Sequence, residues 1–179
     1  MDGHFFVWKR GKLKMKVRFD IRKECYCFDL TRAVIFSAVF VAVAMLVGLF
    51  GGSTHTYTCL LLPRFALGRG LFVIFWTLFY ISFGFALEII LSVNRCAHRE
   101  KAIYCFLIAV AAGYLWFPLF FGMSAFFFSF LLCIFVSILA FVSLKKLIRV
   151  NIFASIVMGI YFVWLVYCSL LNFCIWILN

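Results

Sequence analysis

Long apolar runs constrain this chain more than any other feature of its sequence. The longest, residues 102–144, contains no charged side chain. As one helix rising 1.5 Å per residue it would be about 65 Å long, roughly twice the thickness of a bilayer's hydrocarbon core. The run must therefore turn back on itself, and Gly122-Met123-Ser124, just after Pro118, is its only stretch with turn chemistry.

The other apolar runs are each the length of a single membrane span, which takes roughly 20 apolar residues. The predicted spans are residues 33–50, 71–93, 102–121, 124–144 and 152–178. We therefore expect an all-α membrane protein in which residues 33–179 form a bundle of five transmembrane helices. Residues 1–32 form a basic juxtamembrane segment before it.

The composition excludes soluble classes of protein. Hydrophobic residues make up 68% of the chain and charged residues 13%, about half the charged share of an ordinary soluble domain. So little polar material cannot cover a compact globule in water, which excludes a soluble enzyme or a disulfide scaffold. The pair Cys25-x-Cys27 has no second pair or histidine at zinc spacing, so we expect no metal site.

The positive charge lies on one side of the predicted bundle. The chain has 17 lysines and arginines. All of them except Arg64 and Arg69 lie in one of three segments: before the first span, between the second and third spans, or between the fourth and fifth spans. The positive-inside rule then places the N-terminus inside and the C-terminus outside, in a bacterial cytoplasmic membrane or an organelle membrane such as the mitochondrial one. Because no nucleic-acid motif accompanies the charge, we expect the lipid bilayer as its partner and no nucleic acid.

Aromatic and polar side chains recur along one face of two predicted spans. The second span carries Trp76, Tyr80, Gly84 and Glu88, and the fifth carries Tyr161, Trp164, Cys168, Asn172 and Trp176. Because polar groups avoid lipid, these faces point into the bundle.

Glu88 has two interpretations, a functional acid or a side chain that reaches the inner interface. We expect the indoles of Trp76, Trp116 and Trp164 to converge beneath the loop at residues 51–70.

At these residues the chain resembles the TspO/MBR family, the translocator proteins also called peripheral benzodiazepine receptors. Four stretches carry the resemblance: residues 63–72 followed by Phe75-Trp76-Thr77 and Tyr80, Trp116-Phe117-Pro118-Leu119-Phe120-Phe121-Gly122, Tyr161-Phe162-Val163-Trp164, and Leu171-Asn172 with Trp176 and Asn179. The stretch that begins at Trp116 is similar to the family's Trp-x-Pro-x-Phe-Phe-Gly turn. Together they cover roughly residues 51–179.

The resemblance implies a TspO-like bundle that binds porphyrins, or related lipophilic ligands such as sterols, beneath the 51–70 loop. No cofactor is required, and a porphyrin would be the ligand. The implied ligand-binding residues are Phe65 on the lid and Trp76, Tyr80, Trp116, Tyr161, Trp164, Cys168 and Asn172. Asn172 has a second interpretation as a bond to a neighbouring helix. Some bacterial members degrade porphyrin slowly in light with two tryptophans, which fall on Trp76 and Trp164 here. Catalysis by this chain is left open.

Departures from the family pattern favour an alternative. The loop tryptophan and two prolines of the family are replaced by Phe65, Leu67 and Gly68, and polar residues of its third helix by Ala109 and Gly113. The alternative is a degenerate member that acts as a membrane scaffold or regulatory partner, its cavity filled by phenylalanines. Ala109 and Gly113 also form a small-x-x-x-small pair, which predicts a homodimer face.

Overall fold

The computed structural model describes residues 28–52, 56–94 and 97–179, and helices are the regular secondary structure of these ranges. Five helices are long and apolar enough to cross a membrane, which confirms the predicted all-α bundle. They are α1 (Leu30–Phe50), α3 (Arg69–Ser92), α4 (Ala97–Tyr114), α5 (Phe126–Leu147) and α6 (Ile152–Leu178). The span that begins with α4 continues to Gly122. The short helix α2 (Thr56–Cys59) lies in the first loop. Most of the basic N-terminal segment, with Cys25 and Cys27, lies outside the described residues.

The sharp reversal expected after Pro118 separates α4 from α5. Pro118 has no N–H to donate, and the chain widens there into the π-turn η1 (Pro118–Gly122), in which Met123 N donates to Pro118 O at 3.0 Å. Ser124 then takes a positive φ of 51°, which turns the chain into α5. A single 43-residue apolar run thus becomes two antiparallel spans.

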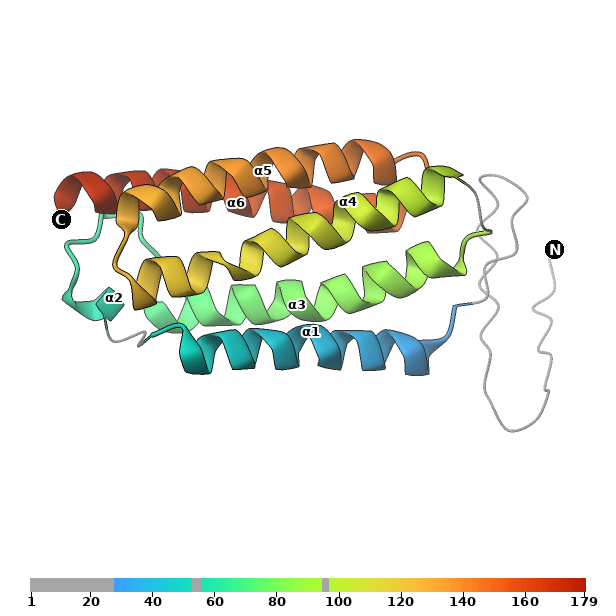
Figure 1. Cartoon of the computed structure of the whole chain (residues 1–179), viewed down its shortest axis with the longest axis horizontal. Coiled ribbons are helices and arrows are strands. Elements are labelled where there is room, and N and C mark those ends of the chain that lie inside the picture. Colours follow the sequence, from blue (N-terminus) through green and yellow to red (C-terminus); the bar gives the residue numbers. More distant parts are fainter. Residues whose placement is uncertain (1–27, 53–55, 95–96) are drawn as a thin grey trace.

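The five long helices run side by side along one axis, with α2 and the C-terminus at the same end (Figure 1). Helix α5 packs against both α4 and α6. Helix α1 packs along α3, and its contacts with the α4 side of the bundle are concentrated at η1. Away from η1, α1 and α4 meet through side chains, such as the rings of Phe40 and Phe106, whose centroids lie 6.5 Å apart.

Close backbone approaches hold α1 in this position. Near its middle, Ser37 Oγ lies 2.8 Å from Ile81 O of α3, and a Cβ on Gly84 would collide with Ser37. At its end, Gly52 has a φ of +106°, and a Cβ there would lie 2.6 Å from Phe121 O. Both glycines are required because no side chain fits between the two backbones.

An ion pair between the half-exposed Arg32 and the buried Glu88 joins the start of α1 to the end of α3. The Glu88 side chain is fully buried, its Oε2 lies 3.3 Å from Arg32 Nε, and its Oε1 accepts from Asp29 N at 3.3 Å. Asp29 in turn caps α1 by accepting from Thr31 N at 3.0 Å. Glu88 therefore ties α3 to α1, and its full burial contradicts the interpretation in which its side chain itself reaches the membrane interface.

The small-x-x-x-small pair is packed inside the chain. Ala109 is fully buried, and a Cβ on Gly113 would lie 2.6 Å from the Tyr161 hydroxyl. Gly113 therefore leaves room for the Tyr161 side chain of α6, and neither residue of the pair offers a surface to a second copy.

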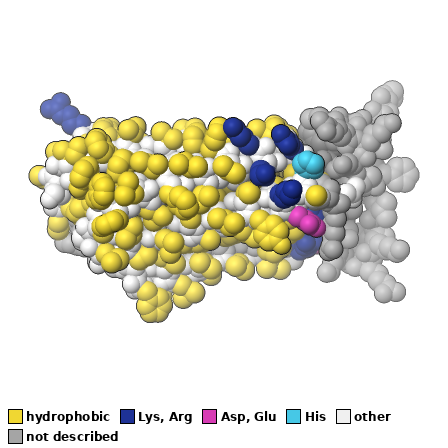
Figure 2. Space-filling view, turned by 45° about the horizontal axis from the view of Figure 1, so that its top comes forward, with side chains coloured by type: hydrophobic (Ala, Val, Ile, Leu, Met, Phe, Trp, Pro, Cys, Tyr) yellow, Lys and Arg dark blue, Asp and Glu magenta, His cyan; other side chains and the backbone are white. Residues whose placement is uncertain are grey.

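The outside of the bundle is apolar along its length, while most basic side chains gather at one end (Figure 2). A surface of this kind is suited to acyl chains. The protein is an integral membrane protein.

We predict that Gly84→Ala lowers the free energy of unfolding by about 1–3 kcal/mol, because the added methyl forces α1 away from α3. Gly70→Ala is the matched control, since Gly70 lies in the same helix and a Cβ there has nothing within 4 Å. Thermal unfolding of both variants in detergent measures the difference. Equal stability of the two variants would contradict the close α1–α3 contact.

Candidate functional site

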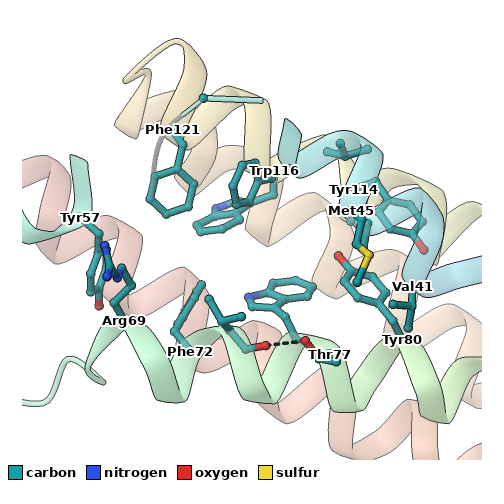
Figure 3. A pocket seen from close by; sticks show the side chains of 18 residues that line it. Val41, Met45, Tyr57, Arg69, Phe72, Thr77, Tyr80, Tyr114, Trp116 and Phe121 are labelled. Carbon is teal, nitrogen blue, oxygen red and sulfur yellow. Dashed lines mark hydrogen bonds between the residues drawn. The ribbon is translucent and has the colours of Figure 1, made fainter. Parts of the chain in front are cut away.

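A cavity of about 510 Å³ occupies the space between α1, α3 and the end of α4 (Figure 3). This volume is within the range of roughly 300–1,000 Å³ for small-molecule sites. Helix α1 contributes aliphatic side chains such as Val41 and Met45, while α3 and the α4–η1 segment contribute aromatic rings. Met45 and Val73 line it and are at least half exposed, so the cavity is continuous with the apolar flank of the bundle.

Two stacked indoles form the centre of the cavity wall. The rings of Trp76 and Trp116 have centroids 6.0 Å apart and an interplanar angle of 16°. Phe120 stacks on Trp116 at 4.9 Å, and Phe72 lies 5.6 Å from it. Both indoles line the cavity, as the sequence predicts for Trp76 and Trp116.

Asn172 fixes the orientation of Trp116. Its Oδ1 accepts from Trp116 Nε1 at 3.2 Å, and its Nδ2 donates to Cys168 O at 2.7 Å. The whole group is buried. Asn172 therefore bonds to a neighbouring segment of the chain, the second of its two interpretations, and acts on the cavity through Trp116.

Two tyrosines close one end of the cavity. The rings of Tyr80 and Tyr114 are stacked, with centroids 4.9 Å apart and an angle of 9°. Tyr114 Oη donates to Phe40 O at 2.7 Å, which bridges α4 to α1. Arg69 and Tyr57 line the opposite end of the cavity (Figure 3). The cavity thus runs from two tyrosines to one cation.

The residues of α6 that the resemblance implied as ligand contacts lie behind the cavity wall. They are Tyr161, Trp164, Cys168 and Asn172, all buried, and none lines the cavity. Trp164 stacks on Phe75 at 4.9 Å and meets Trp76 edge-on at 6.4 Å and 81°. These α6 residues do not line the cavity because Phe72 and Trp76 of α3 lie between α6 and the cavity. The indoles of Trp76 and Trp164 are therefore neighbours, but only Trp76 lines the cavity.

The expected lid residue Phe65 also lies outside the cavity. Its half-exposed ring packs edge-on against Tyr167 at 6.3 Å. The loop around it is tied down, because Tyr167 Oη accepts from Leu67 N and lies 3.2 Å from Phe65 O, and Tyr57 Oη donates to Leu67 O at 3.0 Å. Burial and, to a lesser extent, the nearby Tyr167 raise the pKa of Tyr57 to about 12. A tyrosine is already protonated at physiological pH, and the raised pKa extends the range over which this hydroxyl can donate into more alkaline solution.

The cavity provides stacking surfaces and very few polar groups. Its polar lining consists of Arg69, Thr77 and the hydroxyls and indole nitrogens of its aromatic residues, and no acid, histidine or cysteine of the described ranges lines it. Trp76 Nε1 is buried and has no hydrogen-bond partner among the described residues. A buried donor of this kind is stabilised by an acceptor on a ligand.

Several lining residues were outside the sequence-based set. Val41 and Met45 come from α1, whose residues are apolar on every side and so show no face, and Tyr57 comes from the loop. The sequence does carry a signal for Tyr114, because it lies one helical turn after Val110 on the buried side of α4.

Comparison with protein families shows which family the chain resembles over its length. Residues 34–177 match the model of the TspO/MBR family. The matched range contains every residue that lines the cavity. No curated protein matches the chain closely enough to count as a relative.

We predict that Tyr167→Phe loosens the first loop, because it removes the hydroxyl that bonds to Leu67 N. Each hydrogen bond of this kind contributes about 1 kcal/mol, so amide exchange at residues 61–68 should become roughly fivefold faster. Tyr104→Phe, on the exposed side of α4, is the control and should leave the loop unchanged. Hydrogen–deuterium exchange measures both, and unaltered exchange in Tyr167→Phe would refute the tie.

Proposed function

Because the chain belongs to the TspO/MBR family, we propose that it binds a porphyrin or a related flat, lipophilic tetrapyrrole in the cavity between α1, α3 and α4. The observation that carries the proposal is the near-parallel pair of Trp76 and Trp116 beside a space of about 510 Å³. Indole and phenyl faces stack on flat conjugated rings, and such aromatic pairs contribute about 0.5–1.5 kcal/mol beyond the area that they bury.

The polar ends of the cavity suit a porphyrin dicarboxylate. Arg69 lies at the loop end, exposed and without a salt bridge to any described residue. A carboxylate side chain of the macrocycle would pair with it, while the ring itself occupies the aromatic middle.

The charge distribution supports an orientation with the N-terminus on the cytoplasmic side. Lys101, Lys145, Lys146 and Arg149 lie at the same end as the start of α1, and Arg64 and Arg69 at the other. By the positive-inside rule the first end is cytoplasmic, and the cavity's Arg69 end then faces outward.

The packing behind the cavity supports the alternative of a membrane scaffold without a macrocycle ligand. Phe72, Phe75 and Phe79 fill the space around Trp164, where the family resemblance placed ligand contacts. Under this alternative the remaining cavity holds acyl chains, and a porphyrin titration shows no saturable site. The titrations below distinguish the two functions.

We predict that Trp76→Leu weakens protoporphyrin IX binding about tenfold, because a stacking ring is lost from the cavity wall. Trp176→Leu is the matched control, since Trp176 packs on Phe127 away from the cavity. The shift of the porphyrin's own Soret absorbance measures binding without relying on protein fluorescence. Equal affinities of the two variants for protoporphyrin IX would contradict the proposal that the porphyrin stacks on the aromatic wall of the cavity.

We predict that Arg69→Gln weakens binding of protoporphyrin IX about threefold, the effect of losing one exposed ion pair. Binding of its uncharged dimethyl ester should not change. Arg64→Gln is the control, because Arg64 is an exposed arginine at the same end of the bundle that does not line the cavity. A similar loss for acid and ester would show that Arg69 has no role in carboxylate recognition.

A further inference from the structure

A second cleft, of about 300 Å³, lies between the start of α4 and the end of α5 and is lined almost entirely by basic side chains. They are His98, Lys101, Lys145, Lys146 and Arg149, and Val142 completes the lining. The cleft shares no residue with the aromatic cavity. It belongs to the end of the bundle where the basic side chains gather (Figure 2).

The positive charge of this cleft is not compensated within the described part of the chain. The one salt bridge there joins Arg32 to Glu88, and Glu100, the nearby acid in the first turn of α4, does not line the cleft. Lys145 and Arg149 are one helical turn apart, a spacing at which like charges repel. An anion bound between them would remove this repulsion.

The surface beside the cleft is apolar and hollowed. A groove of about 600 Å³ runs between α5 and α6 and is lined by residues such as Ile138, Phe141 and Phe162. Lys145 connects the two features, because it lines the cleft while its Nζ lies 4.4 Å from the centre of the Phe141 ring. A cationic cleft that leads into an apolar groove is complementary to an anion that carries a long apolar chain.

We propose that the cleft binds the phosphate group of an anionic glycerophospholipid, with one acyl chain in the groove between α5 and α6. Basic pockets between transmembrane helices recognise phosphate headgroups in this way. Lys145, Lys146 and Arg149 from the α5 end and Lys101 from α4 surround the phosphate. The proposal does not depend on porphyrin binding, since the two sites share no side chain.

Native mass spectrometry of the full chain in detergent, titrated with dioleoyl phosphatidic acid, tests the headgroup site. Arg149→Gln should lower lipid retention about fivefold, the effect of one cation near an anionic lipid, and Lys145→Gln with Arg149→Gln about 25-fold. Arg149→Lys should retain binding. Arg64→Gln removes the same charge at the other end and should have no effect. The N-terminal segment is identical in all variants, so its own attraction for lipid cancels.

A second pair of variants tests the groove. Ile138→Ser should lower retention of phosphatidic acid without changing the charge, and Ile108→Ser, an exposed isoleucine of α4 outside the groove, should not. Dioleoyl phosphatidylcholine should bind much more weakly to wild type. Equal losses in Arg149→Gln and Arg64→Gln would overturn the site, as would equal losses in the two isoleucine variants. If glycerol 3-phosphate displaces the lipid at equal concentration, the acyl chain contributes nothing to binding, and this result would contradict the proposal that the cleft binds a phospholipid.

Discussion

The attachment of α1 to α3 determines the rest of the architecture. Glu88 pairs with Arg32 at one end, Ser37 reaches Ile81 O across Gly84 in the middle, and Gly52 lies against the backbone of Phe121 at the other end. These contacts fix α1 on one side of α3, while α4 contacts α1 through Tyr114 and η1. The space left between α1 and α4 is the aromatic cavity.

Some buried polar side chains of this bundle, such as Ser37 and Asn172, connect two segments of the chain. Water is absent from the bilayer core, so a buried polar group that lacks a partner is costly. Asn172 illustrates the result, because one amide group holds the Trp116 ring and the Cys168 carbonyl together. The shape of the cavity wall therefore depends on a residue that does not touch the cavity.

The sequence predicts the spans well because membrane crossing has a simple physical requirement of length and polarity. The reversal after Pro118 could also be predicted, since one apolar run was too long for one helix. The convergence of Trp76 and Trp116 followed from the helical faces and the family resemblance.

The placement of the fifth helix could not be predicted in the same way. Helical periodicity tells which residues of α6 face inward, and Tyr161 and Trp164 do so. It does not tell which side chains of α3 stand in front of them, and here Phe72 and Trp76 separate them from the cavity. The sequence also could not show which residues of α1 line the cavity, because this helix is apolar on every side and no face is distinguished from the others.

The exposed positions of Met45 and Val73 on the cavity wall have a consequence for how the site fills. A hydrophobic molecule dissolved among the acyl chains can enter sideways between the helices without passing through water. Occupancy would then follow the amount of that molecule partitioned into the membrane phase, which for a sparingly soluble compound is far above its aqueous concentration. A modest intrinsic affinity would be sufficient to keep such a site occupied.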